Sequence, residues 1–330
     1  PGISSAASDV YKRQPLQELL MKNTHLEHPE DTILTGDLSV LDALEQEQEI
    51  SVKYDGAPAI VWGKNPATGR QFVGTKSVFN KVKIKICESP ADVMTHYEGH
   101  PIQDILLACL RWLPDTDNIY QGDFIGFGGK EQYQPNTLVY DFDLVVDEHL
   151  IIAPHTQYTT TTTLKDAKAK PLSHNLDCNS DCLFIKPDAG TCINRYNKYG
   201  SKFEFKNYLK FVRQMAQMVT FVTTKEAKEL KKELNSHIRY GIHINPEDFE
   251  NEFLISLWIS VKNLKMIALG QCRHRWGPDA YLIDEGGNPE LVDAEGYVIH
   301  NKIGSYKLVD REWFSHANFN NQRWAKCDAN

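Results

Sequence analysis

The sequence lacks the features that mark membrane, secreted and strongly basic proteins. No stretch approaches the ~20 consecutive apolar residues that a membrane-spanning helix needs, and the N-terminal residues show no basic segment followed by an apolar one, as a secretory signal would. The 36 Lys and Arg residues are outnumbered by 44 Asp and Glu residues, which gives a formal net charge of -8. Overall charge therefore does not indicate nucleic-acid binding, and any basic binding surface must be local.

A disulfide framework is also missing. The chain has 7 cysteines, an odd number at irregular spacing, which favours free thiols in a reducing compartment and hence a cytoplasmic location. A zinc site would need two short ligand pairs, and only Cys178 and Cys182 resemble one. We therefore do not expect zinc.

What the chain does contain is the composition of a folded protein. Hydrophobic residues make up 41% and aromatic residues 10% of the 330 residues, well above the content of disordered chains. At roughly 150 residues per domain, this length predicts two domains, or one large domain with an insertion. Residues 7–14 resemble a translated sequencing adaptor, so residues 1–14 are interpreted as a non-native or disordered extension.

Two kinds of hydrophobic pattern divide the rest of the chain. Short segments with alternating or apolar residues predict antiparallel strands at 49–54, 59–62, 71–74, 119–124, 138–146, 182–185, 281–283, 295–300 and 305–309. Apolar residues at helical spacing predict a helix over 102–113 and several helices over 203–269. The helical segment, residues 201–275, is therefore expected to be an insertion between residues 15–200 and residues 276–330 of an α+β domain.

One group of short segments carries candidate chemistry. The first is Lys53-Tyr54-Asp55-Gly56, at the end of a predicted strand. A lysine there is usually solvated, and this tetrapeptide alone occurs often by chance. The later segments add weight because each has a polar residue at the edge of a predicted strand: Gly122-Asp123-Phe124, Phe142-Asp143-Leu144, Glu295-Gly296-Tyr297-Val298-Ile299 and Tyr306-Lys307-Leu308-Val309.

This order of motifs resembles the covalent nucleotidyltransferase superfamily, which contains ATP-dependent RNA and DNA ligases and capping enzymes. Phrases such as K-x-D-G-A-P-A-I-V and K-L-V-D-R-x-x-F-S are most similar to RNA-ligase-like proteins of large tailed bacteriophages. The resemblance covers about residues 50–319. It implies an ATP-grasp-like ligase adenylation domain of antiparallel sheets, and a location in the host cytoplasm if the protein is viral. Too few residues follow Val309 to form the C-terminal OB barrel of DNA ligases and capping enzymes, which favours an RNA ligase.

The resemblance implies a role for each motif residue. Lys53 would attack the α-phosphate of ATP to form lysyl-AMP, and Lys307 would assist as the final lysine of the family. Asp123 and Glu295 would bind Mg²⁺, directly or through water, or contact the ribose and the lysine. The remaining nucleotide-binding candidates are Asp55, which can also simply shape its turn, Gly56 for close backbone approach, Lys76 and Lys302 for phosphate charge, and Phe142 for adenine stacking.

Elementary chemistry fits these residue types. Only a neutral amine is nucleophilic, and an unperturbed lysine has a pKa of about 10.4. Neighbouring cations or a metal, together with partial burial, would be needed to lower the pKa of Lys53. The expected function is therefore ATP- and Mg²⁺-dependent joining of 5′-phosphate to 3′-hydroxyl ends, of RNA rather than DNA, with the oligomeric state left open.

Alternatives remain. The chain could be a DNA ligase, a capping-type guanylyltransferase, or an inactive phage protein that uses the same fold for binding or structure. The sequence departs from the family pattern at Asp123, where Glu is usual, and at Val309, where a second lysine is common. Residues 181–186, followed by Lys202 and Lys206, are a rival for the last two motifs, but they lack the Glu-Gly pair.

Overall fold

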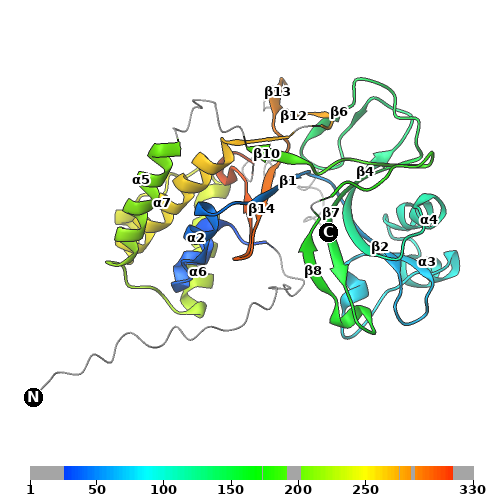
Figure 1. The fold of residues 1–330 in the computed structure, drawn as a ribbon, viewed down its shortest axis with the longest axis horizontal. Coiled ribbons are helices and arrows are strands. Elements are labelled where there is room, and N and C mark those ends of the chain that lie inside the picture. Colours follow the sequence, from blue (N-terminus) through cyan, green and yellow to red (C-terminus); the bar gives the residue numbers. More distant parts are fainter. Residues whose placement is uncertain (1–25, 173, 192–201, 275, 284–286, 315–330) are drawn as a thin grey trace, which may run out of the picture.

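The computed structural model describes residues 26–172, 174–191, 202–274, 276–283 and 287–314. They form an α+β structure in which β9 and β7 are the one parallel pair among the strand pairs described. Figure 1 shows helices gathered on one side, a large sheet with two further helices on the other, and a small sheet between them. The adaptor-like residues 1–14 lie outside the described residues. No helix within these ranges is long and apolar enough to cross a bilayer.

The large sheet confirms most of the strands predicted in the first half of the chain. Its strand order is β3-β2-β4-β7-β8, with β9 beside β7. Helices α3 and α4 cover one face, where Trp62 stacks on Phe184 with ring centroids 5.7 Å apart. The elements are β2 (Ala59–Lys64), β3 (Gln71–Gly74), α3 (Pro90–Tyr97), α4 (Gln103–Trp112), β4 (Ile119–Phe127), β7 (Leu150–Thr159), β8 (Lys168–Pro171) and β9 (Cys182–Phe184), with single 3₁₀ turns η2 (Lys76–Phe79) and η3 (Leu164–Asp166) at one end.

The small central sheet consists of β1 (Glu49–Lys53), β14 (Gly296–His300) and β15 (Ser305–Leu308), in that order and fully antiparallel. Successive side chains of a strand point to opposite faces. Val52, Tyr297 and Leu308 are at most 2% exposed and pack into the main hydrophobic core. The opposite face is therefore left for the polar residues of the same strands.

The helices of the predicted insertion pack against the N-terminal helices of the described chain. The contacting pairs include α1 with α7 and α2 with α5, so two segments far apart in the sequence contribute to one helical layer (Figure 1). Its elements are α1 (Pro29–Thr32), η1 (Ile33–Thr35), α2 (Ser39–Glu45), α5 (Lys202–Ala216), α6 (Thr224–Arg239), η4 (Pro246–Asp248) and α7 (Glu252–Leu269). The capping box of Thr223 and Glu226 begins α6, as this residue pair favours.

The predicted strand at 138–146 is shorter than expected. It ends at Asp141, because Asp143 adopts a left-handed conformation with φ of 61° and turns the chain. The remaining strands form a four-stranded sheet in the order β13-β12-β6-β5 and a two-stranded one, β10-β11. These are β5 (Gln132–Tyr133), β6 (Val139–Asp141), β10 (Ala189–Thr191), β11 (Cys272–His274), β12 (Asp279–Ile283) and β13 (Pro289–Val292).

Candidate functional site

A cavity of about 360 Å³ lies between the polar face of the small sheet and the large sheet. Five of the residues predicted from the sequence line it: Lys53, Lys76, Asp123, Glu295 and Lys307. They come from five segments of the chain, and the first and last of these residues, Lys53 and Lys307, are 254 positions apart. The fold therefore brings the core of the predicted constellation to one place.

Strand register explains one wall of the cavity. Lys53 of β1 pairs with Gly296 of β14, and Val298, two residues further along β14, pairs with Lys307 of β15. Residues two apart on a strand share a face, so Lys53 and Lys307 both point away from the core and into the cavity. The backbone N–H of Glu295 donates to the carbonyl of Lys53 over 3.1 Å, which fixes the carboxylate beside the amine.

Gly296 is required by this geometry. Its φ is +148°, in a region that favours glycine, and a Cβ there would lie 2.2 Å from the carbonyl oxygen of Leu308. The glycine thus allows β14 and β15 to approach closely, directly beside Glu295. The glycine of the Glu-Gly pair is therefore needed for the packing of β14 against β15.

The opposite wall comes from β4 and β7. Asp123 of β4 lies opposite Ala153 of β7, and its Oδ1 is 3.6 Å from Nε2 of His155. His155 occupies a β-bulge, because Gln121 pairs with Thr156 while Gly122 pairs with Pro154. Bulges redirect side chains, and here both residues that follow Pro154 line the cavity.

Glu295 controls the charge of Lys53. The Lys53 ammonium donates a hydrogen bond to Oε2 of Glu295, and the two side chains are 30% and 13% exposed. Burial alone would lower the pKa of Lys53, but the attraction of Glu295, reinforced by Asp123 and Asp55, outweighs it and raises this pKa. The pKa of Lys53 is thus raised rather than lowered, and the lysine is held as an ammonium. Burial also raises the pKa of Glu295, although Lys53 opposes the shift.

Lys307 is in the reverse situation. No ion pair or hydrogen bond of its ammonium occurs among the described residues, and burial together with the nearby positive charge of Lys53 lowers its pKa. A partly buried cation without a counter-ion is costly. Of these two cavity lysines, Lys53 is neutralised by a carboxylate, whereas Lys307 has no counter-ion among the described residues and could bind an anion.

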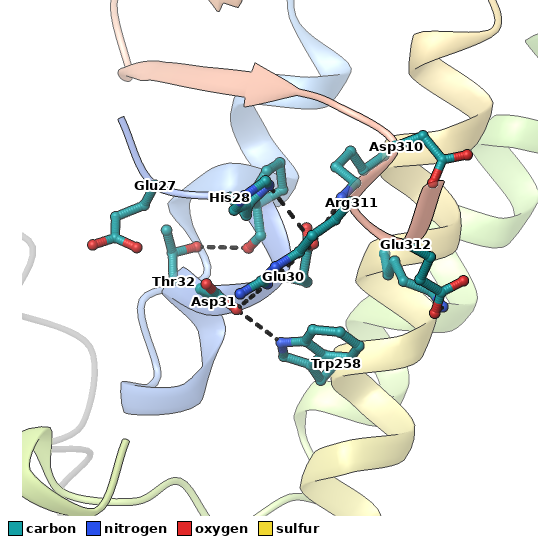
Figure 2. A network of polar contacts seen from close by, with 12 residues as sticks. Glu27, His28, Glu30, Asp31, Thr32, Trp258, Asp310, Arg311 and Glu312 are labelled. Atoms are coloured by element: carbon teal, nitrogen blue, oxygen red, sulfur yellow. Dashed lines mark hydrogen bonds and ion pairs between the residues drawn. The ribbon is translucent and has the colours of Figure 1, made fainter. Parts of the chain in front are cut away.

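A buried polar network lies behind Lys307, where β15 ends. Figure 2 shows Arg311 reaching between the N-terminal segment and α7. Its guanidinium is 2.9 Å from Oδ1 of Asp31, which also accepts a hydrogen bond from Trp258 over 3.1 Å. Lys265 of α7 donates to Oε1 of Glu30 over 2.7 Å, and both side chains are fully buried. This network joins the helical layer to the strand that carries Lys307.

His28 lies beside the same network. Its Nδ1 has no hydrogen-bond partner among the described residues and lies 3.9 Å from Oε1 of Glu30. Burial lowers its pKa far below the usual range, and the positive charge of Lys307 acts in the same direction. His28 is thus a neutral imidazole at physiological pH.

Four of the predicted site residues do not line the cavity. Phe142 packs edge-on against Tyr133, with ring centroids 5.6 Å apart, so it offers no stacking face there. Lys302 is exposed on the turn between β14 and β15. Both residues were predicted to bind the nucleotide from local motifs, and a local motif does not determine on which side of a sheet a side chain lies.

Asp55 and Gly56 have structural roles. Asp55 is 5% exposed and accepts hydrogen bonds from the side chain of Asn136 at 2.6 Å and the backbone of Thr137 at 2.7 Å. A Cβ at Gly56 would lie 2.7 Å from Cβ of Asp123. The glycine therefore allows close approach to β4. Asp55 anchors the turn after Lys53, which is the alternative role given for it in the sequence analysis.

The structure adds cavity residues that the sequence analysis missed. His155, Gln121 and Lys170 line the cavity together with Tyr158, whose hydroxyl donates to Gln121 over 2.6 Å. Pro154 weakened the strand signal of β7, because proline is rare inside strands. A histidine one residue after that proline was the one local hint.

The rival motifs lie elsewhere. Cys182 and Phe184 of the 181–186 segment belong to β9 and are buried in the core beside β7. Lys206 lies on α5 and does not line the cavity. A second, larger cavity of about 560 Å³ lies between α4 and residues 147–149, and it contains none of the predicted site residues.

The donor set suits Mg²⁺ bound together with phosphate oxygens. No group of three or more His, Cys, Asp or Glu residues that could hold a metal occurs within the described ranges. Mg²⁺ is commonly held by one or two carboxylates, with substrate phosphates and water completing its shell. Asp123 and Glu295 are two carboxylates on the same cavity, and they fit this mode rather than an all-protein site.

Comparisons with known proteins identify a family. A model of the "Family of unknown function (DUF6267)" matches residues 23–254 and 242–323, so the chain belongs to that family. The matched residues include every side chain of the cavity described above. No curated protein and no solved structure matches the chain.

Proposed function

We propose that this protein is an ATP-dependent polynucleotide ligase, acting on RNA, that forms a lysyl-AMP intermediate at Lys53. The observation that carries the proposal is the convergence of Lys53, Asp123, Glu295 and Lys307 on one cavity. The same proposal includes a nucleotidyltransferase fold, with the ATP site between the small sheet and the large sheet. The match of motif order to ligases supports it.

In the first step, the Lys53 amine forms a bond to the α-phosphorus of ATP while the bond to pyrophosphate breaks. The amine must first lose a proton. Glu295 is the group that accepts the hydrogen bond from the Lys53 ammonium, and burial raises its pKa, so Glu295 is placed to take that proton. Proton transfer within this pair converts the resting ammonium into the nucleophile.

Two other lysines of the cavity would offset the negative charge of the ATP phosphates. Lys307 has no counter-ion among the described residues, and Lys76 lies at the same cavity. When bound, Mg²⁺ would neutralise phosphate charge and orient the leaving group. Asp123 and Glu295 are the residues that would hold it.

The later steps use the same site. AMP passes from Lys53 to the 5′-phosphate of a nucleic acid, and a 3′-hydroxyl then attacks that phosphate and releases AMP. His155 is 3.6 Å from Asp123, and its ring can hold or move a proton at this end of the cavity. It is therefore a candidate base for the attacking hydroxyl.

The test is covalent labelling with ATP that carries a radioactive α-phosphate, in the presence of Mg²⁺. We expect a labelled protein band that is lost in Lys53→Ala and retained in Lys64→Ala, a lysine of β2 that pairs with Asp117 outside the cavity. A parallel reaction with GTP separates a ligase from a capping-type enzyme. Absence of label from the wild-type protein would favour the alternative of an inactive binding protein.

A further inference from the structure

Two segments beside the cavity concentrate positive charge in an otherwise acidic chain. Residues 76–85 contain four lysines and no acidic residue, and residues 165–170 contain three lysines and one aspartate. The whole chain has a net charge of -8. Such a local excess against the overall charge is the electrostatic pattern expected of a surface that meets a polyanion.

The two segments lie side by side. The turns η2 and η3 are in contact, and both are found at the same end of the large sheet, near β8 (Figure 1). The ring of Phe79 lies 4.4 Å from that of Tyr158, measured between centroids, and Tyr158 pairs with Ala169 of β8. Tyr158 and Ala169 also line the cavity, so the basic segments are continuous with it.

Six of these lysines form what we call the lysine strip: Lys76, Lys81, Lys83, Lys165, Lys168 and Lys170. None of them makes an ion pair within the described ranges, whereas Lys64 and Lys262 elsewhere are paired with carboxylates at 2.8 and 2.5 Å. The seventh lysine, Lys85, is excluded because its ammonium donates to the carbonyl of His96 over 2.9 Å. The strip therefore presents uncompensated charge.

The one acidic residue in these segments forms no ion pair with a lysine of the strip among the described residues. The carboxylate of Asp166 accepts hydrogen bonds from the side chain and backbone of Thr161 and from the backbone of Thr163. The hydrogen bond from Thr161 is the main reason why the pKa of Asp166 falls to about 2, which keeps this carboxylate ionised and tied to its own loop. Its role is to shape the turn that presents the neighbouring lysines.

The strip begins inside the cavity and continues onto the surface. Lys76 and Lys170 line the cavity, while Lys81, Lys83 and Lys168 are exposed outside it. Lys168 and Lys170 are two residues apart on the edge strand β8 and so share a face, about 7 Å apart along the strand. A nucleotide in a cavity of about 360 Å³ would be reached by the inner lysines and would not extend to the outer ones.

We propose that the lysine strip binds the phosphate backbone of the nucleic-acid strand whose end enters the cavity. This inference rests on the proposed function for the position of that end, and it adds the path of the rest of the strand. A polyanion that starts at Lys76 and Lys170 and passes over Lys81, Lys83 and Lys168 matches the repeated charge of a polynucleotide. RNA and DNA share this phosphate backbone, so the test measures the affinity for each of them.

The strip has a measurable salt signature. Each phosphate that a lysine neutralises on a single strand contributes about 0.7 to the slope of log affinity against log salt. Replacing Lys81, Lys83 and Lys168 by glutamine should therefore reduce the slope by about 2. The fall in affinity between roughly 50 and 200 mM salt should then be about twentyfold smaller than for the wild-type protein.

The experiment is fluorescence anisotropy with a 5′-phosphorylated single-stranded RNA and a DNA of the same sequence. The test variant is Lys81→Gln/Lys83→Gln/Lys168→Gln in the full chain. The matched control is Lys225→Gln/Lys228→Gln/Lys232→Gln, which removes three exposed charges from α6 in the helical layer. Lysyl-AMP formation is measured on the same samples, because the three replaced lysines do not line the cavity and should not affect the first step.

We expect the strip variant to bind both oligonucleotides more weakly at low salt, with the reduced slope, and to form lysyl-AMP at the wild-type rate. An unchanged slope and affinity, or an equal loss in the α6 control, would overturn the proposal. Binding to vesicles of anionic phospholipid is measured for the same proteins. A strip variant that binds the vesicles more weakly than the wild-type protein, but binds the oligonucleotides equally well, would also overturn the proposal. If the wild-type protein forms no lysyl-AMP, the proposed ligase function fails, while the salt slope still decides the role of the strip.

Discussion

The ion pair between Lys53 and Glu295 allows a specific test of how the nucleophile is controlled. Glu295 accepts a hydrogen bond from the Lys53 ammonium and stabilises its charged form. The substitution Glu295→Gln keeps the shape and a hydrogen-bond acceptor but removes the negative charge. We therefore expect the pKa of Lys53 to fall and its neutral, reactive form to become more abundant.

The size of the effect follows from the exposure of the pair. The side chains of Lys53 and Glu295 are 30% and 13% exposed, so the pair is partly screened by solvent. An ion pair of this kind contributes about 1 kcal/mol, at the upper end of the range for exposed pairs. Since RT is ~0.6 kcal/mol, its loss should raise the fraction of neutral Lys53 about fivefold at a pH near neutrality.

The assay is acylation by an amine-selective ester, followed at each lysine by peptide mass spectrometry between about pH 6 and pH 10. The pH at which Lys53 becomes reactive should be lower in Glu295→Gln, while the profile of Lys64 on the surface serves as an internal reference. The control is Glu312→Gln, which removes the partner of Lys262 outside the cavity and should leave Lys53 unchanged. A Lys53 profile that is unchanged or moved to higher pH in Glu295→Gln would refute the reasoning.

Three further predictions concern stability. Lys307→Met should stabilise the protein by about 1 kcal/mol at neutral pH, because it removes a partly buried cation whose pKa is lowered. Between the lowered pKa of Lys307 and the unfolded value of ~10.4, the wild-type unfolded state binds more protons than the folded state. The stability difference between variant and wild type should therefore shrink as the pH rises toward ~10.4, as thermal melts at several pH values would show. Gly296→Ala should lower the free energy of unfolding by at least about 2 kcal/mol in urea titrations, because its Cβ would lie 2.2 Å from the Leu308 carbonyl oxygen and its φ is +148°. Lys265→Met should cost about 3 kcal/mol, because the buried Glu30 loses its closest partner and keeps only the longer ion pair to Arg311, at 3.6 Å. Lys265→Met/Glu30→Leu should recover most of that loss, and equal destabilisation by the single and double variants would contradict this interpretation.

The sequence predicted those site residues whose position depends on local pattern. Alternation in β1 and β15 placed Lys53 and Lys307 opposite the apolar face of their strands, and burial of Val52 and Leu308 confirms that parity. Motif order alone carries no distances, and it is the fold that places Lys53, Lys76, Asp123, Glu295 and Lys307 around one cavity.

What could not be predicted depends on distant pairing. The contact of Glu30 with Lys265 spans 235 residues, and neither residue has a local signal for burial. Phe142 and Lys302 fit local motifs, yet the short strand that ends at Asp141 and the exposed turn of Lys302 place them away from the cavity. His155 was missed because a β-bulge, set by the pairing of two strands, decides where its side chain points.

The most direct test of the central claim is site-resolved detection of AMP on the protein. Wild-type protein would be incubated with ATP and Mg²⁺, digested at low temperature under conditions that preserve phosphoramides, and analysed by peptide mass spectrometry. The account predicts AMP on Lys53, lost in Lys53→Ala and reversed by added pyrophosphate. Protein that stays unmodified, or AMP attached at a lysine outside the cavity, would contradict it.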